Sequence, residues 1–183
     1  YNPYWTHVIS YHEWLGHNVQ IAAAAEHVDR PIRKAYNSSY LSQAWSFYLE
    51  KLLPDEGYYD DKLDYITGLN THMGRLQMRM WRVQRIITKI RMAMGDMTFD
   101  EAVEAYIDEI GMEPTNAFIE VQRDSQSPHP PGREIIGEIA ILEMRDEYQR
   151  RMGRHYSMKR FHDTFLTYGD IPFKQIERLM LEQ

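Results

Sequence analysis

The string HEWLGH at residues 12–17 decides how the rest of this chain is interpreted, because it brings two histidines and a carboxylate into six residues. Neutral imidazole nitrogens hold Zn²⁺, and a carboxylate beside them can take the proton of a metal-activated water. The better-known spacing places the histidines four residues apart on one helix face, whereas here they are five apart. On a regular α-helix this spacing separates His12 from His17 by roughly 140°. We therefore expect a π-type bulge near Gly16, which would widen the helix locally.

The string predicts a catalytic metal site in which each residue has a role. His12 and His17 are the predicted metal ligands, and Glu13 is the predicted general base. A third protein ligand is needed, with one coordination position left open. The next predicted helix offers Gln43 and Glu50, which lie about 10 Å apart along that helix, so that only one of them could reach the metal. The alternative is an ordinary helix whose polar side chains face solvent or satisfy buried groups.

Helical periodicity covers almost the entire chain, and no alternating pattern longer than a few residues indicates a strand. Proline and glycine mark the helix ends, and the spacing from Thr98 to Glu101 is that of a capping box. The predicted helices span residues 5–27, 38–53, 62–94, 98–110, 114–123, 133–152, 157–167 and 172–181. The helix over 62–94 is apolar on several faces, which predicts a central, buried helix. The predicted fold class is all-α.

Composition indicates a globular protein of one domain, or part of a larger one. The chain has 183 residues, and its formal net charge of −6 argues against a general nucleic-acid binder. No apolar run approaches the roughly 20 residues of a membrane span. Zero cysteines exclude disulfides, Cys-ligated zinc and thiol chemistry. Because residues 1–5 lead directly into the metal-site helix, we expect the carboxyl-terminal part of something longer, completed by an amino-terminal half or a partner subunit.

Secondary candidates for contact with a peptide or small-molecule substrate lie in the last third of the chain. His162 and Asp163 are neighbours in one predicted helix, where they either orient a substrate or form a buried His–Asp hydrogen bond. Arg133 follows the proline-rich loop at residues 125–132 and is a further substrate-binding candidate. That loop also holds a single histidine, His129.

Two family resemblances follow from these motifs. The H-E-x-x-G-H spacing resembles that of dipeptidyl peptidase III, a zinc peptidase, but this likeness stops after six residues. Nearly the whole chain resembles the carboxyl-terminal half of the bacterial domain-of-unknown-function 885 family, helical proteins regarded as zincin-like. Four strings carry that likeness in the family's order, namely HEWLGHNVQ at 12–20, QAWSFYLE at 43–50, MWRVQR at 80–85 and FHDTFLTYGDIPF at 161–173.

The second resemblance implies a multi-helix, gluzincin-type fold, a zinc site on the first helix and a periplasmic or extracellular location. The departures from the family pattern fall on polar positions. The spacing between the histidines is one residue shorter, and Gln43 stands where the family has the Glu expected as third ligand. Lys89 and Ala93 replace the ionisable residues of a D-x-x-x-H motif. Residues at packing positions match the family pattern, whereas residues at polar positions differ from it. The resemblance therefore implies a retained fold with an altered active site.

Three functions are therefore open. The first is a zinc-dependent hydrolase that acts on peptide or amide bonds. The second is a non-catalytic helical binding or structural protein on a degenerate metallopeptidase scaffold. The third is one part of a two-part enzyme, for which we expect a large exposed apolar patch beside the first helix.

Overall fold

A computed structural model describes residues 2–28, 30–35, 39–127 and 130–181. All regular structure in these ranges is helical, which confirms the all-α fold class. Within them, no helix is both long and apolar enough to cross a membrane. The predicted helix start at Ser38 and the loop histidine His129 lie outside the described residues.

The chain divides into two compact units. Unit 1 consists of Tyr1–Thr71 and Arg133–Gln183, and unit 2 consists of His72–Gly132. The long helix α6 (Tyr65–Met94) begins in unit 1 and continues into unit 2. The expectation that residues 1–183 form a single domain stays a prediction.

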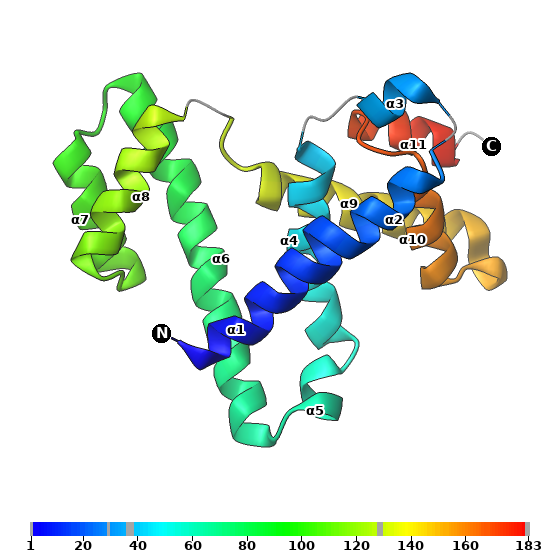
Figure 1. Ribbon diagram of the computed structural model, residues 1–183, viewed down its shortest axis with the longest axis horizontal. Coiled ribbons are helices and arrows are strands. Elements are labelled where there is room, and N and C mark those ends of the chain that lie inside the picture. Colours follow the sequence, from blue (N-terminus) through cyan, green and yellow to red (C-terminus); the bar gives the residue numbers. More distant parts are fainter. Residues whose placement is uncertain (1, 29, 36–38, 128–129, 182–183) are drawn as a thin grey trace. The chain divides into compact units, whose positions relative to one another are not determined.

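Unit 1 opens with a continuous helical rod made of α1 (Pro3–Ser10), η1 (Tyr11–Gln20) and α2 (Ile21–Glu26), drawn in blue in Figure 1. Asn2 caps the rod, because its side-chain oxygen accepts a hydrogen bond from the amide of Tyr4. The middle segment, η1, is a π-helix of ten residues. The expected widening near Gly16 is therefore confirmed, and it extends over the whole string from Tyr11 to Gln20.

The helix α4 (Tyr40–Asp55) lies at the centre of unit 1, with η1 on one side and α9 (Arg133–Met152) on another. Two glycines permit this close packing. A Cβ atom on Gly16 would lie 2.2 Å from Ser46 Oγ, and one on Gly137 would lie 2.2 Å from the Ala44 Cβ. The crossing points on α4 thus require residues without side chains on the neighbouring helices.

The start of α4 is held by a residue distant in the sequence. Ser39 has a left-handed backbone conformation (φ 58°) and makes no side-chain cap to its own helix. Instead, the two carboxylate oxygens of Asp170 accept hydrogen bonds from the amides of Ser39 and Leu41, at 3.0 and 3.2 Å. A carboxylate at a helix amino terminus is stabilised by the helix dipole as well as by these bonds.

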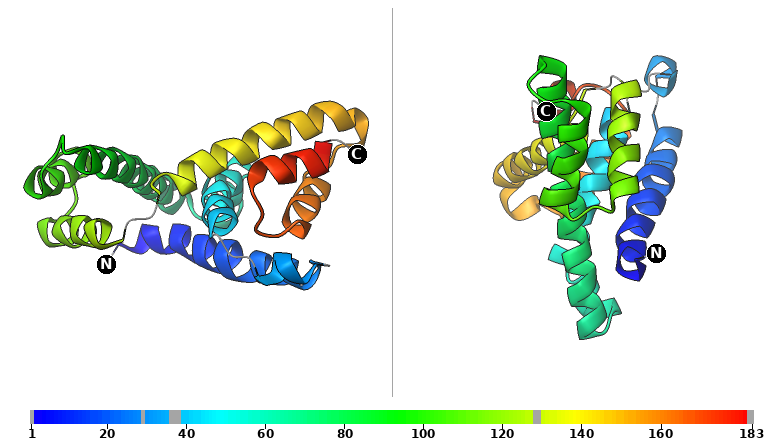
Figure 2. Two further views of the ribbon diagram at one scale, coloured as in Figure 1. Left: turned by 90° about the horizontal axis from the view of Figure 1, so that it is seen from above. Right: turned by 90° about the vertical axis from the view of Figure 1, so that its left-hand side faces the viewer.

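The core of unit 1 is completed by α10 (Met158–Thr167) and α11 (Phe173–Leu181), which lie between α9 and α2 in Figure 2. Large buried side chains from α4, α9, α10 and α11 pack together there, namely Trp45, Tyr48, Ile141, Phe161, Phe165 and Ile176. Three short elements connect the main helices, namely α3 (Pro31–Ala35), α5 (Tyr58–Lys62) and η2 (Gly153–His155). Helices α3 and α5 were not predicted, since five residues give too short a periodic pattern.

Unit 2 packs the later turns of α6 against α7 (Phe99–Ile110) and α8 (Pro114–Gln126), drawn in green and yellow-green in Figure 1. The predicted capping box at Thr98 and Glu101 is present. Buried Tyr106 lies in the core, where its hydroxyl is 3.3 Å from Thr88 Oγ1 of α6. Charged side chains also join α6 to α8, because Arg85 pairs with Glu120 at 2.7 Å and Lys89 with Asp124 at 3.2 Å.

The prediction that the long helix is central and buried was wrong. One side of α6 contacts α7 and α8, but another side is an exposed row of apolar residues. The exposed members are Ile66, Leu69, Met73, Leu76, Met80, Val83, Ile87, Ile90 and Met94. The apolar residues of α6 therefore form two separate faces, one that packs against α7 and α8 and one that is exposed. The buried helix is α4 instead.

Candidate metal centre

The π-helical backbone of η1 brings the two histidines of the string together. A π-helix bonds residue i to residue i+5, so residues five apart lie about one turn apart on the same side. The Nε2 atoms of His12 and His17 are accordingly 3.1 Å apart, with the ring planes inclined at 75°. The five-residue spacing that conflicts with an α-helix is thus suited to the helix that forms.

Helix α4 supplies a partner for the other nitrogen of each imidazole. His12 Nδ1 lies 2.6 Å from Glu50 Oε1, and both side chains are buried. With Glu50 ionised and His12 neutral, Nδ1 of His12 donates to the carboxylate and its Nε2 carries a lone pair. His17 Nδ1 lies 2.6 Å from Ser42 Oγ, and this bond is partly buried. Ser42 and Glu50 are eight residues apart on α4, which is about two turns.

Further contacts fix η1 on its neighbours along its whole length. At its start, the hydroxyl of Tyr11 is 2.6 Å from that of Tyr59. At its end, the indole Nε1 of Trp45 donates to Gln20 Oε1 at 2.7 Å. Between them, Gly16 lies directly on Ser46. The position of the histidines therefore depends on packing contacts that do not involve the imidazoles themselves.

The donor set fits a divalent metal such as zinc. Ligand atoms of His12, Glu13 and His17 all lie within 4.8 Å of one another. Two nitrogens bound tetrahedrally to one zinc are separated by about 3.3 Å, given Zn–N distances of about 2.0–2.1 Å. The observed separation of 3.1 Å is close to this value. A lone pair on His12 Nε2 that faces a second imidazole nitrogen also requires a proton or a cation between them.

The two residues considered as third ligand occupy different places. Glu50 contacts the outer nitrogen of His12 through Oε1, on the side away from the facing Nε2 atoms. A carboxylate in that place orients a metal-binding histidine and raises its basicity. Gln43 follows Ser42 on α4 and is half-buried. Their assignment as metal ligands stays a prediction.

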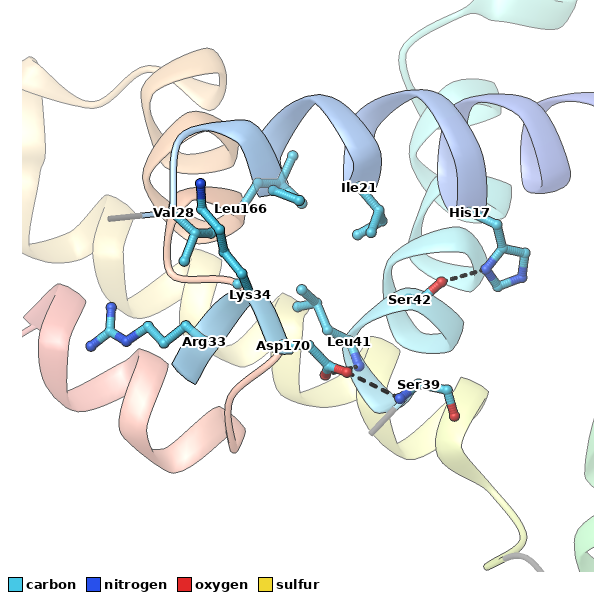
Figure 3. A pocket seen from close by; sticks show the side chains of 12 residues that line it. His17, Ile21, Val28, Arg33, Lys34, Ser39, Leu41, Ser42, Leu166 and Asp170 are labelled. Carbon is cyan, nitrogen blue, oxygen red and sulfur yellow. Dashed lines mark hydrogen bonds between the residues drawn. The ribbon is translucent and has the colours of Figure 1, made fainter. Parts of the chain in front are cut away.

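A cavity of about 310 Å³ begins at His17 and extends along α2 and α4 (Figure 3). Ile21, Leu41 and Leu166 give it apolar walls, and the Ser42 hydroxyl bonded to His17 lies at one end. Its lining belongs entirely to unit 1. The cavity has the composition of a small binding site, with apolar walls and a few polar groups that converge.

The secondary candidates are not brought to the histidine pair by any contact of their own. His162 Nε2 is 2.9 Å from the hydroxyl of Tyr48, and burial, together with Arg145, lowers the His162 pKa to about 4. Asp163 is exposed and pairs with Lys159, so it does not form the suggested bond to His162. Arg133 donates to Ser39 Oγ at the start of α4. His162 and Asp163 do line a second cavity, with Gln20 and His27.

Sequence reasoning missed the residues of α4 that support the site. Ser42 and Ser46 were not singled out, although with Glu50 they repeat every four residues and so share one helix face. That pattern is a usable signal, because small and polar residues at i, i+4 and i+8 interrupt an otherwise apolar helix. Tyr59 carried no comparable signal, since its partner Tyr11 is 48 residues away.

The family described as "Bacterial protein of unknown function (DUF885)" matches residues 1–180. The chain belongs to this family. No curated protein matches the chain.

Two solved structures share the fold of this family member. One is described as a "putative lipoprotein" from Colwellia psychrerythraea, with 22% identity and a TM-score of 0.86. The other, described in the same words and as of unknown function, is from Shewanella oneidensis, with 23% identity and a TM-score of 0.83. The matches cover 98% and 99% of this chain but only 30% and 32% of the two solved chains. The chain thus spans about a third of their length.

Proposed function

We propose that unit 1 carries a zinc-dependent hydrolase site that acts on peptide or amide bonds. The observation that supports this proposal most directly is the pair of Nε2 atoms 3.1 Å apart, with each Nδ1 atom held by α4. Such a pair combines the ligand type, the spacing and the outer hydrogen bonds of a histidine-bound metal. The family and the fold agree with this proposal without specifying any activity.

Each residue of the cluster has a separate task in the proposed site. His12 and His17 would hold the metal through Nε2, while Glu50 and Ser42 keep the rings oriented through Nδ1. Zinc bound there would supply a lowered pKa for water and a polarised substrate carbonyl. Glu13 is exposed and within reach of the pair, so it takes a proton from water and returns it to the departing amine. Gln43 is the proposed source of a third ligand, and Glu50, the alternative source, would have to leave His12 Nδ1 to reach the metal.

The substrate and the location are part of the same proposal. The cavity that starts at His17 would accept one side chain of a peptide, next to the bond that is cleaved. Its lining includes Arg33, Lys34 and Asp170 as well as the apolar walls. The two solved relatives are each described as a "putative lipoprotein", so we place the protein in the periplasm or outside the cell. His162, Asp163 and Arg133 remain proposed substrate contacts. His162 and Asp163 line the second cavity, and Arg133 lies beside Ser39 of the first.

A non-catalytic binding protein is the second candidate, because η1 carries exposed apolar side chains beside the histidines. Trp14 is 67% exposed, and Leu15 and Val19 are also exposed. An apolar surface of this kind is typical of interaction sites. The same residues are the exposed patch expected if another chain or segment completes the enzyme.

Zinc binding by the purified chain tests the proposed site. After removal of metals with a chelator, isothermal titration with zinc chloride should show one equivalent bound. His12→Ala and His17→Ala should each abolish binding, whereas His27→Ala, an exposed histidine at the end of the same rod, should bind as the wild type does. Absence of zinc uptake, or uptake unaffected by His12→Ala, would contradict the proposal.

The variant Glu13→Gln separates catalysis from binding. If Glu13 is the base, the variant binds zinc normally but cleaves a peptide library at least about 100-fold more slowly than the wild type. Cleavage products would be followed by mass spectrometry. An unchanged biological activity in Glu13→Gln would favour the non-catalytic function instead.

A further inference from the structure

The exposed side of α6 in unit 2 has a regular pattern. Seven exposed apolar side chains follow one another at alternating intervals of three and four residues. We call this row the α6 seam, and it consists of Met73, Leu76, Met80, Val83, Ile87, Ile90 and Met94. Leu69 and Ile66 continue the same spacing towards the start of the helix. A repeat of seven residues with two apolar positions is the pattern by which one helix packs along another.

One flank of the seam is polar throughout, and the other is polar only in its first half. Gln77, Gln84 and Arg91 follow the seam on one flank, and on the other His72 and Arg79 are followed by Ile86 and Ala93. A helix that lies in a membrane surface needs a wider apolar face, usually with aromatic residues. The seam contains no aromatic residue, and its width suits the contact with a single helix.

The charge of α6 indicates what the opposing helix carries. Although the chain has a net charge of −6, α6 contains six basic residues and no acidic one. The basic residues are Arg75, Arg79, Arg82, Arg85, Lys89 and Arg91. Arg85 and Lys89 pair with α8 on the inner side, and Arg82 is buried. The basic residues beside the seam are Arg79 and Arg91. A second copy of α6 would bring like charges together, whereas a helix with acidic flanks would match them.

We propose that the α6 seam is a docking surface for a helix with an apolar heptad stripe and acidic flanks. We assign this helix to the part of the family fold that lies outside the matched third of the two solved relatives. The length of those relatives supports the assignment, because about two thirds of each chain has no counterpart in these 183 residues. A seam that is exposed here is covered in the longer fold.

Synthetic peptides test the chemistry of the partner. One 28-residue peptide carries Leu and Ile at its heptad positions and Glu on both flanks, and a matched peptide carries Lys on the flanks. Fluorescence anisotropy should show at least tenfold tighter binding of the Glu peptide to the 183-residue chain. Val83→Glu, in the middle of the seam, should abolish this binding, and Ile139→Glu, an exposed aliphatic position on α9, should not. Equal binding of both peptides, or no binding, would overturn the proposal.

The source of the helix is tested by comparing chains of different length. In the 183-residue chain Val83 is exposed, so Val83→Glu should leave the Tm unchanged. In the full-length Shewanella oneidensis relative, a Glu at the residue that superposes on Val83 should lower the Tm by several degrees. An unchanged Tm in the relative would show that its remaining chain does not cover the seam.

Two other occupants can be detected directly. If this chain sediments as a dimer and Val83→Glu dissociates the dimer, the occupant is a second copy. If the chain binds only to anionic vesicles, the occupant is a membrane. Either result would overturn the proposal.

Discussion

Unit 1 and unit 2 bury polar side chains in different ways. In unit 2, each buried carboxylate between α6 and α8 faces a basic group, as Glu120 faces Arg85 and Asp124 faces Lys89. In unit 1, one carboxylate and one hydroxyl hold two imidazoles whose remaining nitrogens face each other. The balanced charges of unit 2 join two helices, whereas the facing nitrogens of unit 1 are the ligands of the proposed metal site. This difference supports the proposal that the polar cluster of unit 1, unlike that of unit 2, binds an ion.

The largest effect is expected from breaking the balanced charges of unit 2. Glu120→Ala leaves the mostly buried guanidinium of Arg85 without its carboxylate, which should cost about 3 kcal/mol of unfolding free energy. Arg123 binds the same carboxylate but is 54% exposed, so Arg123→Ala should cost less than about 1 kcal/mol. Urea denaturation followed by circular dichroism measures both. Equal losses would show that burial does not determine the strength of these pairs.

A smaller loss is expected where η1 crosses α4. In Gly16→Ala the added Cβ would lie 2.2 Å from Ser46 Oγ and 2.7 Å from Ser46 Cα, so the two helices must separate. Overpacking of this kind costs about 2 kcal/mol. Gly68→Ala is the matched control, since its Cβ would meet only ordinary contacts at 3.5 Å or more and should stabilise the α-helix by up to about 1 kcal/mol. Thermal unfolding of both variants decides the comparison, and a neutral Gly16→Ala would contradict this account of the crossing.

The sequence predicted those parts of the site that depend on local backbone geometry. Histidines five residues apart require a widened helix, and η1 is such a helix. The contacts with α4 could not be predicted in the same way. Which α4 residues meet His12 and His17 depends on the crossing at Gly16 and Ser46, a long-range packing contact. Glu50 was accordingly considered as a ligand, although it contacts the outer nitrogen of His12.

The same limit explains the error on α6. An apolar sequence pattern shows that a face avoids water, but it does not show which partner covers the face. Trp81 and Met92 pack against α7 and α8, while Val83 and Ile87 of the same helix are exposed. Both sets contribute equally to the periodicity. The all-α class was predictable because it requires only the helical period, whereas burial requires the identity of the neighbours.

The variant Glu50→Gln distinguishes two roles of the His12–Glu50 pair, a support for metal binding and an ordinary buried pair. Glu50→Gln keeps the shape of the side chain but removes the charge that raises the basicity of His12, so zinc affinity should fall by about 10- to 100-fold. Ser42→Ala removes a neutral partner and should lower zinc affinity by less. Competition titration with a chromophoric chelator measures both. If Glu50→Gln lowered the stability of the protein but left its zinc affinity unchanged, the pair would resemble the ion pairs of unit 2.

The smallest effect concerns another imidazole of unit 1, that of half-buried His162, whose Nε2 is bonded to Tyr48. Burial and the nearby Arg145 lower its pKa to about 4, while Asp163 acts weakly in the opposite direction. In the unfolded chain the pKa of histidine is about 6.5, so between pH 6.5 and 4 the unfolded state binds more protons. Stability should therefore fall as the pH drops through this window, by about 1 kcal/mol after allowance for partial exposure. His162→Gln, which keeps a hydrogen-bonding group for Tyr48, should flatten the dependence of the urea midpoint on pH.

Because zinc would bind at His12 and His17, the same pH titration of stability with zinc present should keep the loss of stability due to His162. It should also add a second, metal-dependent loss of stability at acid pH. A single step that vanishes in His12→Ala would instead assign the pH dependence to the facing pair.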